Sequence, residues 1–449
     1  MLKPITQDDI VALATPPGIG AIAVIRVSGL ELESLYKKVT RSKLAPKPRY
    51  SNYTTIYQPN NKPIDNCLIT YFKKPNSFTG EDVIEISSHG GHFIPKAILG
   101  MLYREKVRQA APGEFSYRAF INGKMDLIQA ESISGIIASK TKINASVQLS
   151  NLNGFLSKSI ARIKEETVHL LTILEHELDF SEEEINFTKK DEISSVLGLI
   201  YTKTANILNS SNFGKAINSG ARVVLCGKPN AGKSSLFNRL SGSSRAIVTN
   251  IAGTTRDTIE SWIEIAGIPV CIVDTAGITK TENPIESHGI RRTNTEIANS
   301  DILLVLDEQN PSKFYKQNRL ENSNKDVILI HTKSDLFSPR DINKKHIKIS
   351  VKKDSGISTL LTELSTLLKQ NMSYDYSVDP VVVSERQKIL LNKGLAVLGV
   401  AKEQINRDVD MVILSSLLRE FIEHLEELLG KIGNDDIFNN LFSSFCVGK

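Results

Sequence analysis

The spacing of hydrophobic and polar positions divides the chain into three kinds of segment. Before about residue 122, short runs rich in β-branched residues alternate with turn signals. The runs predict strands at Ala21 to Val27, Cys67 to Phe72 and Val83 to Ser87, and turns rich in glycine and proline lie at 16–20 and 89–91. This pattern predicts an α+β domain over residues 1–122.

A helical pattern begins near Leu127 and returns near the C-terminus. In the first block, apolar residues recur at three- and four-residue steps with charges between them, which predicts one long helix with an apolar stripe. The stripe consists of Leu152, Phe155, Leu156, Ile160, Ile163, Leu170, Leu171, Leu174 and Leu178. Similar spacing runs from Ile413 to Leu429. We expect one helical domain, made of residues 123–215 and 374–449, interrupted by an inserted domain at 216–373.

The inserted region alternates short buried strands with helical or loop segments. The expected strands are Arg222 to Cys226, Val270 to Val273, Ile302 to Leu306, Val327 to His331 and His346 to Ile349. Such alternation predicts a doubly wound, mainly parallel sheet of the α/β class. The polar stretch from Glu308 to Asp326 is expected to be a surface loop or an irregular helix.

Composition narrows the class of protein without identifying it. The 449 residues, 41% hydrophobic and 23% charged, are typical of a soluble protein of about two to four domains. A formal net charge of +5 favours an anionic partner only weakly. No start resembling a secretory signal and no run near the ~20 apolar residues of a membrane span are present, so we expect a cytoplasmic protein with no membrane segment.

The cysteines give no support for a zinc site. Cys67, Cys226, Cys271 and Cys446 lie far apart and form no C-x-x-C pair. Few cysteines without a framework fit a reducing compartment.

A phosphate-binding loop is the first motif that carries chemistry. Gly227 to Ser234 fits G-x-x-x-x-G-K-[ST] and lies between a predicted strand and a predicted helix. The glycines let backbone amides close around phosphate oxygens, and the helix N-terminus adds its positive dipole end. Lys233 is expected to reach the β- and γ-phosphates, and Ser234 to ligate Mg²⁺. The expected nucleotide contacts here are Asn230, Ala231, Gly232, Lys233, Ser234 and Ser235.

Three further segments favour GTP over ATP. Asp274-Thr275-Ala276-Gly277 ends a strand, where the aspartate can hold the Mg²⁺ shell and the glycine amide can sense the γ-phosphate. Thr332-Lys333-Ser334-Asp335 ends another, and the Asp335 carboxylate can accept two hydrogen bonds from guanine N1–H and its 2-amino group. Ser350-Val351-Lys352 follows the last strand and is expected to contact guanine O6 through backbone amides. Thr332 stands where most GTPases carry asparagine.

The catalytic group is not that of Ras-like enzymes. The position after the switch-II glycine, where those enzymes carry glutamine, is Ile278, while Arg256 and Arg291 remain unassigned. An alternative is a monovalent cation in the place of an arginine finger, near Asn230 and the loop from 249 to 257. That loop supplies the remaining expected nucleotide contacts, which are Thr249, Asn250, Ile251, Ala252, Gly253, Thr254 and Thr255.

Five stretches together resemble the MnmE (TrmE) family of tRNA-modifying GTPases, over essentially all 449 residues. They are Ala14 to Gly18 with Arg26 to Gly29, Asn76 to Asp82 with His89 to Gly91, Pro112 to Phe115, the GTPase motifs, and the C-terminal Phe445 to Lys449. The resemblance implies a GTPase that is activated by K⁺ and dimerises through its G domains. It also implies that hydrolysis serves to modify the wobble uridine of certain tRNAs.

The resemblance implies roles for particular residues of the GTP site. The matched K⁺ positions are Asn230, Thr249, Ile251 and Thr254, and the matched Mg²⁺ ligands are Ser234 and Thr255. Glu286 matches the glutamate that orients the attacking water. Two positions depart from the usual pattern: Thr332, and Thr279, where many members carry arginine.

The resemblance also implies a second site in the first domain. Arg26, Glu85, Lys124 and Lys449 match positions that bind a tetrahydrofolate one-carbon donor, the 5-formyl or 5,10-methylene derivative. This domain is expected to form a constitutive homodimer. Cys446 is either a thiol nucleophile for uridine chemistry or a packing residue beside the folate.

The expected partner is a flavin protein of the MnmG type, forming a heterotetramer with the homodimer. No dinucleotide motif G-x-G-x-x-G follows a strand, so redox chemistry must come from that FAD-carrying partner. The alternative function is a GTP-gated ribosome-assembly or RNA-binding switch of the Era-like group. Such factors usually append an RNA-binding module, whereas this chain ends in a leucine-rich amphipathic helix and C-x-G-K.

Overall fold

The fold is taken from a computed structural model of the chain. The structure describes residues 8–179, 189–242, 259–275, 294–318, 320, 325–337, 346–370, 379–406, 411–431, 438, 441–443, 445 and 448. The chain forms two compact units, which are described separately below. The first contains Met1–Ser134, Asn151–Thr172 and Ser415–Lys449, and the second contains Gly135–Ser150 and Ile173–Leu414. The three domain boundaries expected from the sequence stay a prediction.

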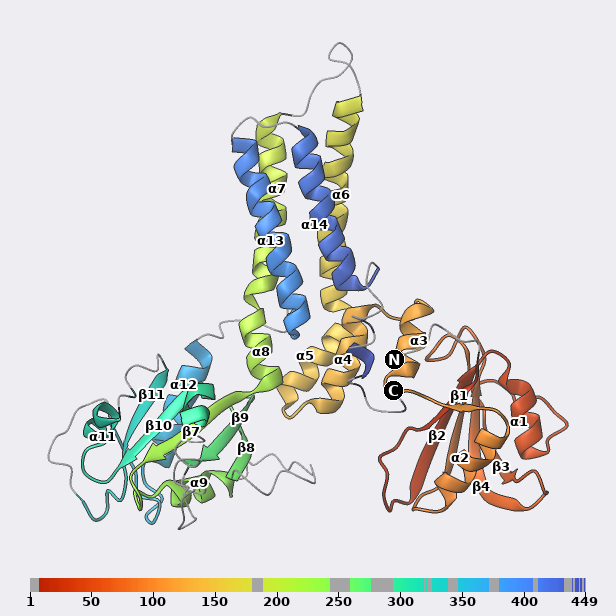
Figure 1. Cartoon of the computed structure of the whole chain (residues 1–449), viewed down its shortest axis with the longest axis horizontal. Coiled ribbons are helices and arrows are strands. Elements are labelled where there is room, and N and C mark those ends of the chain that lie inside the picture. The colour runs from red at the N-terminus through yellow and green to blue at the C-terminus, as the bar shows by residue number, and fades with distance from the viewer. Residues whose placement is uncertain are drawn as a thin grey trace. The chain divides into compact units, whose positions relative to one another are not determined.

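The first unit contains a six-stranded, mainly antiparallel sheet (Figure 1). Its order is β3-β4-β5-β2-β1-β6, and only β1 and β6 pair in parallel. The strands are β1 (Ile10–Leu13), β2 (Ile22–Gly29), β3 (Ser51–Tyr57), β4 (Pro63–Phe72), β5 (Asp82–His89) and β6 (Arg108–Gln109). The three strands expected from the sequence are confirmed as β2, β4 and β5.

Helices cover one face of this sheet. α1 (Leu32–Thr40) and α2 (Ile94–Arg104) share a core with alternate strand residues such as Ile25, Val27 and Ile86. Because side chains alternate along a strand, Arg26 points to the opposite face. The helix α3 (Glu114–Ile121) follows β6 and is part of the polar network described below. The α+β class expected for this region is confirmed.

Long helices occupy much of the remaining chain in both units. They are α4 (Leu127–Ala138), α5 (Lys142–Leu152), α6 (Phe155–Asp179), α7 (Lys190–Asn209), α8 (Ser211–Ser219), α13 (Glu385–Asn406) and α14 (Met411–Leu429). α7 and α13 run side by side in the second unit (Figure 1). In the first unit, Lys164 of α6 forms an ion pair with Glu426 of α14.

The expected helix over Leu152 to Leu178 differs from the structure at its start. Leu152 is the last residue of α5, and α6 begins at Phe155. Between them Gly154 has a φ of +83°, in the left-handed region that ends helices. The three- and four-residue spacing continued through this turn and therefore did not reveal it.

The second unit contains the doubly wound sheet predicted for the inserted region. Its order is β12-β11-β10-β7-β9-β8, parallel throughout except for the β8–β9 hairpin. The strands are β7 (Ala221–Gly227), β8 (Ile259–Ile265), β9 (Ile268–Asp274), β10 (Ile302–Asp307), β11 (Asp326–His331) and β12 (Ile347–Lys348). The five strands expected here are confirmed, while β8 escaped the sequence analysis.

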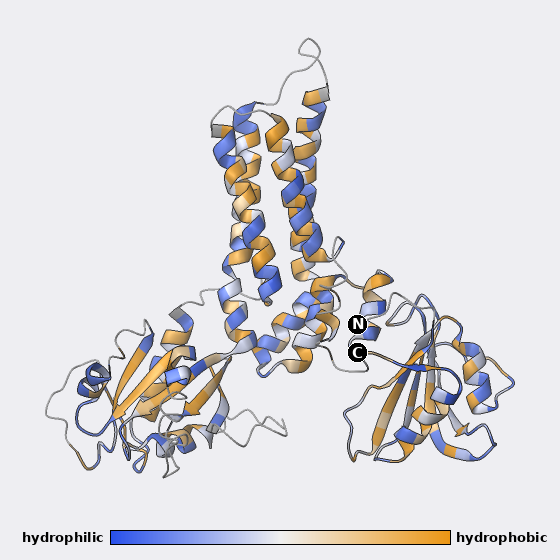
Figure 2. Cartoon of the chain, in the orientation of Figure 1, coloured by the Kyte–Doolittle hydropathy of each residue, from blue (hydrophilic) through white to orange (hydrophobic). Residues whose placement is uncertain are grey.

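Both faces of this sheet carry a core. Helices α9 (Lys233–Ser241) and α12 (Ile357–Gln370) pack with alternate strand residues such as Val223, and α11 (Pro311–Gln317) lies on the face of Val224. Figure 2 shows the central strands β7, β9, β10 and β11 as mostly hydrophobic. α11 lies within the polar stretch 308–326, for which the sequence predicted a surface loop or an irregular helix.

Among the helices that the structure describes, not one combines the length and the apolar character that a membrane crossing requires.

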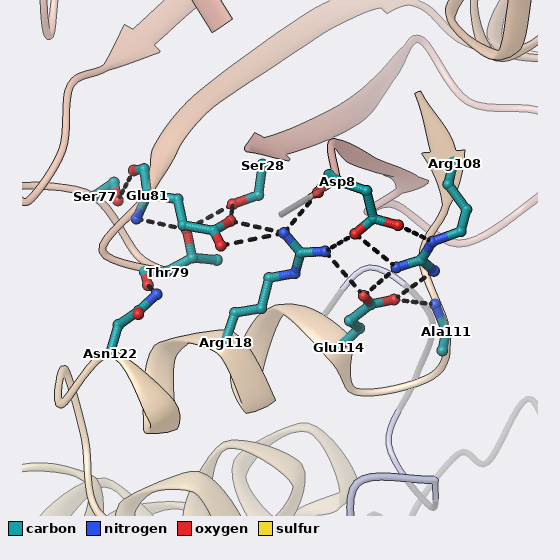
Figure 3. A network of polar contacts seen from close by, with 10 residues as sticks. All are labelled: Asp8, Ser28, Ser77, Thr79, Glu81, Arg108, Ala111, Glu114, Arg118 and Asn122. Atoms are coloured by element: carbon teal, nitrogen blue, oxygen red, sulfur yellow. Dashed lines mark hydrogen bonds and ion pairs between the residues drawn. The ribbon is translucent and has the colours of Figure 1, made fainter. Parts of the chain in front are cut away.

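A buried network of charges ties the N-terminal segment, two loops and α3 together (Figure 3). The Arg118 side chain is 4% exposed and donates hydrogen bonds to Glu81 at 3.0 Å, Glu114 at 3.1 Å and Asp8 at 2.9 Å. Arg108 donates to Asp8 at 2.7 Å and to Glu114 at 2.6 Å. Two guanidinium groups thus face three carboxylates, so each buried charge has an opposite partner, as burial requires.

Hydroxyl and amide groups complete this network. Ser28 Oγ of β2 donates to Glu81 Oε2 at 2.8 Å and lies 2.7 Å from Thr79 Oγ1. Asn122 donates its side-chain amide to the Thr79 carbonyl at 2.7 Å. Burial by itself would raise the pKa of Glu114, but hydrogen bonds from Arg108 and a backbone amide outweigh it and lower the pKa. The network fixes the loop from 77 to 81 against the sheet and α3.

Replacing Arg118 with methionine should destabilise the first unit by about 3–5 kcal/mol, because Glu81 would keep a buried charge without its cation. We would follow thermal unfolding of the full chain by circular dichroism and by fluorescence of Trp262, the single tryptophan, which lies in the second unit. The melting temperature reported by Trp262 fluorescence should stay unchanged, while the circular dichroism signal should show that the first unit melts at a lower temperature. Arg104→Met, at an exposed arginine, is the control. Equal effects of the two substitutions would contradict the assignment.

Candidate functional site

The loop between β7 and α9 has the backbone that phosphate binding needs. Asn230 and Gly232 adopt left-handed conformations, with φ of +63° and +87°. At Gly227, an added Cβ would lie 2.3 Å from the carbonyl oxygen of Leu306, so only glycine fits this close approach to β10. The predicted strand–loop–helix context is confirmed, and α9 begins at Lys233.

Lys233 lies buried at the centre of this loop. Its ammonium group donates to the carbonyl oxygens of Gly227 at 2.8 Å and Lys228 at 2.7 Å. Burial lowers the pKa of Lys233, and the nearby Asp274 carboxylate partly opposes this effect. These two bonds hold the lysine side chain within the loop.

The structure also brings Ser234 and Asp274 together. Ser234 Oγ donates to Asp274 Oδ2 at 2.7 Å, although 40 residues separate them in the sequence. Asp274 ends β9 and is fully buried. Thr275 donates its hydroxyl to the Leu225 carbonyl at 2.7 Å. Two hard oxygen donors at the mouth of a phosphate loop are a suitable starting set for Mg²⁺.

The predicted guanine-reading residues also come together. Asp335 accepts a hydrogen bond from Ser350 Oγ at 2.6 Å, and this bond is the main cause that lowers the pKa of Asp335. The Ser334 amide donates to the carbonyl oxygen of Ile349 at 3.1 Å. Val351 and Lys352 follow in the turn after β12. A charged carboxylate is thus held where two base donors could pair with it.

Thr332 takes no part in side-chain hydrogen bonding among the residues that the structure describes. It is 5% exposed, and its buried Oγ1 has no partner there. A Cβ built on Gly232 would lie 3.7 Å from Thr332 Cβ, so the threonine packs beside the phosphate loop. Its amide donates to the Asp307 carbonyl at 3.1 Å.

Several predicted residues lie outside the described part of the chain. They are Thr249, Asn250, Ile251, Ala252, Gly253, Thr254, Thr255, Ala276, Gly277, Glu286, Cys446 and Lys449. Their expected roles in binding K⁺, Mg²⁺, GTP and folate therefore stay predictions.

In the first unit, Arg26 and Glu85 form one paired site. They are direct cross-strand neighbours on β2 and β5, and Arg26 Nε and Nη2 donate to Glu85 Oε1 at 2.9 and 2.7 Å. The rings of Phe78 and Phe115 lie 5.3 and 5.9 Å from the guanidinium carbon. Arg26 also donates to the carbonyl oxygen of Gly448 at 3.4 Å, which brings the C-terminal segment to this pair.

Lys124 contacts the loop that carries Phe78. Its ammonium group donates to the Pro75 carbonyl at 3.0 Å, and its side chain packs against Gly80. It also lines a cavity of about 550 Å³ with residues of α3, α4 and the end of α14. The structure therefore brings Arg26 and Glu85 into contact and places Lys124 on the neighbouring loop.

The described cysteines are not reactive groups. Cys67, Cys226 and Cys271 are buried, and burial raises the pKa of each thiol to about 12. Among described residues, no three His, Cys, Asp or Glu side chains gather as a metal site.

Comparison with known proteins decides the family. The family model described as the MnmE helical domain matches residues 127–446, and the model of the GTP-binding protein TrmE N-terminus matches residues 9–124. The tRNA modification GTPase MnmE of Aquifex aeolicus (strain VF5) is 37% identical over 450 residues, covering 99% of this chain and 100% of that protein. The chain belongs to the MnmE family of tRNA modification GTPases.

A second relative agrees with this membership. MnmE of Francisella tularensis subsp. novicida (strain U112) is also 37% identical, over 459 residues and the full length of that protein. Among solved structures, Aquifex aeolicus Era bound to GDP and AlF4⁻ is 24% identical and covers 39% of this chain and 67% of its own, with a TM-score of 0.26.

Two acidic residues at the end of β10 escaped the sequence analysis. Asp307 pairs with Lys228 of the phosphate loop at 2.8 Å, and Glu308 pairs with Lys333. Lys333 belongs to the base segment, which is the predicted guanine-reading stretch from Thr332 to Asp335. The available signal was the position of the two acidic residues directly after a predicted parallel strand, at the sheet edge where ligands bind. The network around Arg118 was missed too, although Glu81 and Glu114 lie in stretches typical of the MnmE family.

Asp335→Asn should lower GDP affinity by at least about 100-fold, because two charge-assisted hydrogen bonds to guanine are lost. Affinity for xanthosine diphosphate should rise, since its base presents an acceptor where guanine presents the 2-amino donor. Both are measured by fluorescence titration with labelled nucleotides. Asp354→Asn is the control, because Asp354 is an exposed carboxylate of the next turn, paired with Arg239. Unchanged GDP affinity in Asp335→Asn would remove Asp335 from the base site.

Proposed function

We propose that this chain is a K⁺-dependent GTPase that modifies the wobble uridine of certain tRNAs. Together with a flavin-dependent partner of the MnmG type, it installs a carboxymethylaminomethyl group on C5, with a tetrahydrofolate derivative as the one-carbon donor. The observation that carries the GTPase half is the joined site of Lys233, Ser234 and Asp274, with Asp335 on the base side. Membership of the MnmE family supports the tRNA half.

The metal ligands follow from the donor types present. Ser234 Oγ and the Asp274 carboxylate offer hard oxygen donors of the kind that Mg²⁺ binds, and Thr255 is the expected additional ligand. Bound Mg²⁺ would neutralise charge on the β- and γ-phosphates. Lys233, held inside the loop, adds a fixed positive charge at the same place.

The expected K⁺ site compensates for a missing group. Ile278 cannot orient water as glutamine does in Ras-like enzymes. Asn230 is exposed in the phosphate loop and has a left-handed backbone conformation, so its side-chain amide oxygen is accessible to a cation there. Thr249, Ile251 and Thr254 are the other proposed ligands. Glu286 is the proposed catalytic residue that orients the attacking water.

The folate half of the proposal depends on Arg26 and Glu85. A carboxylate can pair with the pterin amino group, while cations such as Lys124 and Lys449 can pair with the glutamate tail. The Phe78 ring beside Arg26 offers an aromatic surface to a flat heterocycle. Cys446 is proposed as a packing residue beside the folate.

The proposed assembly is a homodimer that joins two copies of the flavin partner in the cytoplasm. The redox step needs that partner, because the chain has no dinucleotide-binding motif after a strand. GTP hydrolysis is proposed to drive association of the G domains and a change of conformation.

GTP turnover should be at least about tenfold faster in KCl than in NaCl of equal ionic strength, since Na⁺ is too small to take the place of K⁺. Asn230→Ala should remove this difference. Glu286→Gln should bind labelled GTP normally in KCl and lose about 100-fold or more in turnover. Equal wild-type rates in the two salts would refute K⁺ dependence.

The tRNA half is tested by mass spectrometry of tRNA nucleosides from a deletion strain. Carboxymethylaminomethyluridine should be absent, and should return with the wild-type gene. Arg26→Met should fail to restore it while the purified variant hydrolyses GTP at the wild-type rate, because Arg26 lies outside the GTP site. Arg49→Met, at an exposed arginine of the same unit, should restore it. Unchanged wobble uridines with accumulation of immature ribosomal subunits would instead support the Era-like alternative.

A further inference from the structure

The end of β10 offers two adjacent carboxylates to two different nucleotide-contacting loops. We propose that Asp307 and Glu308 are positioning residues that hold the phosphate loop and the base segment together. They replace a side-chain hydrogen bond to the phosphate loop that asparagine could make at position 332 and Thr332 does not make. The inference rests on the GTP site proposed above.

Asp307 reaches the phosphate loop through Lys228. The Asp307 side chain is 4% exposed, and its Oδ2 lies 2.8 Å from the ammonium nitrogen of Lys228. Its Oδ1 accepts from the amides of Gln309 and Asn310, both at 2.8 Å. Burial alone would raise the pKa of Asp307, but the bond from Lys228 and these two amides outweigh it and lower the pKa. The carboxylate is therefore charged and fixed, so it can orient the more exposed lysine.

The same residue and its neighbour also reach the base segment. The Asp307 carbonyl oxygen accepts from the Thr332 amide at 3.1 Å, and the Glu308 carboxylate forms an ion pair with Lys333. Lys333 has a φ of +51°, so this segment needs contacts that hold an uncommon backbone conformation. One short turn thus contacts both loops from the same strand end.

Thr332 explains why such a link is needed. Asparagine at this position could donate an amide hydrogen bond to the adjacent phosphate loop, whereas Thr332 only packs there, its Cβ 3.7 Å from where a Cβ on Gly232 would lie. Its buried Oγ1 has no hydrogen-bond partner among described residues. The ion pairs of Asp307 with Lys228 and of Glu308 with Lys333 connect the base segment to the phosphate loop, which Thr332 cannot do.

The test is the dissociation rate of fluorescent GDP from the full-length protein, measured by stopped flow. Lys228→Met should release GDP about threefold to tenfold faster, as expected for one partly exposed ion pair. Asp307→Asn should do the same, and the double variant should be no faster than the more affected single variant. Lys316→Gln removes an exposed lysine of α11 and should leave the rate unchanged.

Rescue separates positioning from general destabilisation. Adding Thr332→Asn to Lys228→Met should bring the rate to within about twofold of the wild type, because the amide restores the link. Lys228→Arg should also stay near the wild-type rate. Unchanged dissociation in Lys228→Met, or defects that persist in the presence of Thr332→Asn, would overturn the proposal.

Failure of the proposed function gives a different result. If the wild-type chain bound no labelled GDP, the GTP site itself would be wrong. If the wild type bound GDP and all variants matched it, only the positioning role would be wrong.

Discussion

Parallel strand pairing is the constraint on which the GTP site depends. β7, β9, β10 and β11 lie side by side in parallel, so their carboxyl ends meet at one edge of the sheet. The phosphate loop and the base segment follow β7 and β11, while Asp274 ends β9 and the Asp307–Glu308 pair lies at the end of β10. Segments about 100 residues apart in the sequence are joined there because the backbone ladder fixes their register.

In the first unit, antiparallel strand pairing positions the paired site. The sheet is mainly antiparallel with α1 and α2 on one face, so the opposite face can present Arg26 and Glu85 as a cross-strand pair. The loop that adds Phe78 to this pair is fixed through Thr79 and Glu81. The buried charges around Arg118 therefore hold a loop beside the paired site, at the desolvation cost that any buried ion network carries.

Lysines act in two ways at the nucleotide site. Lys233 is buried and bonded within its own loop, so its place follows from the local motif. Lys228 is largely exposed, and its place depends on a carboxylate from another strand. The first kind of contact is visible in a sequence motif, whereas the second is created only when the sheet forms.

The sequence by itself determined the fold classes, the main strands and the phosphate loop, because periodicity and local motifs depend on near neighbours in the chain. It also predicted nucleotide contacts at Ser234, Asp274, Asp335 and Ser350, and the structure shows Ser234 bonded to Asp274 and Ser350 bonded to Asp335. It could not show the turn at Gly154, since the apolar spacing of α5 and α6 runs on across it. Only the tertiary structure decided the contacts of Asp307, Glu308 and Arg118, because the partners of a buried charge are set by strand order and packing rather than by chain neighbours.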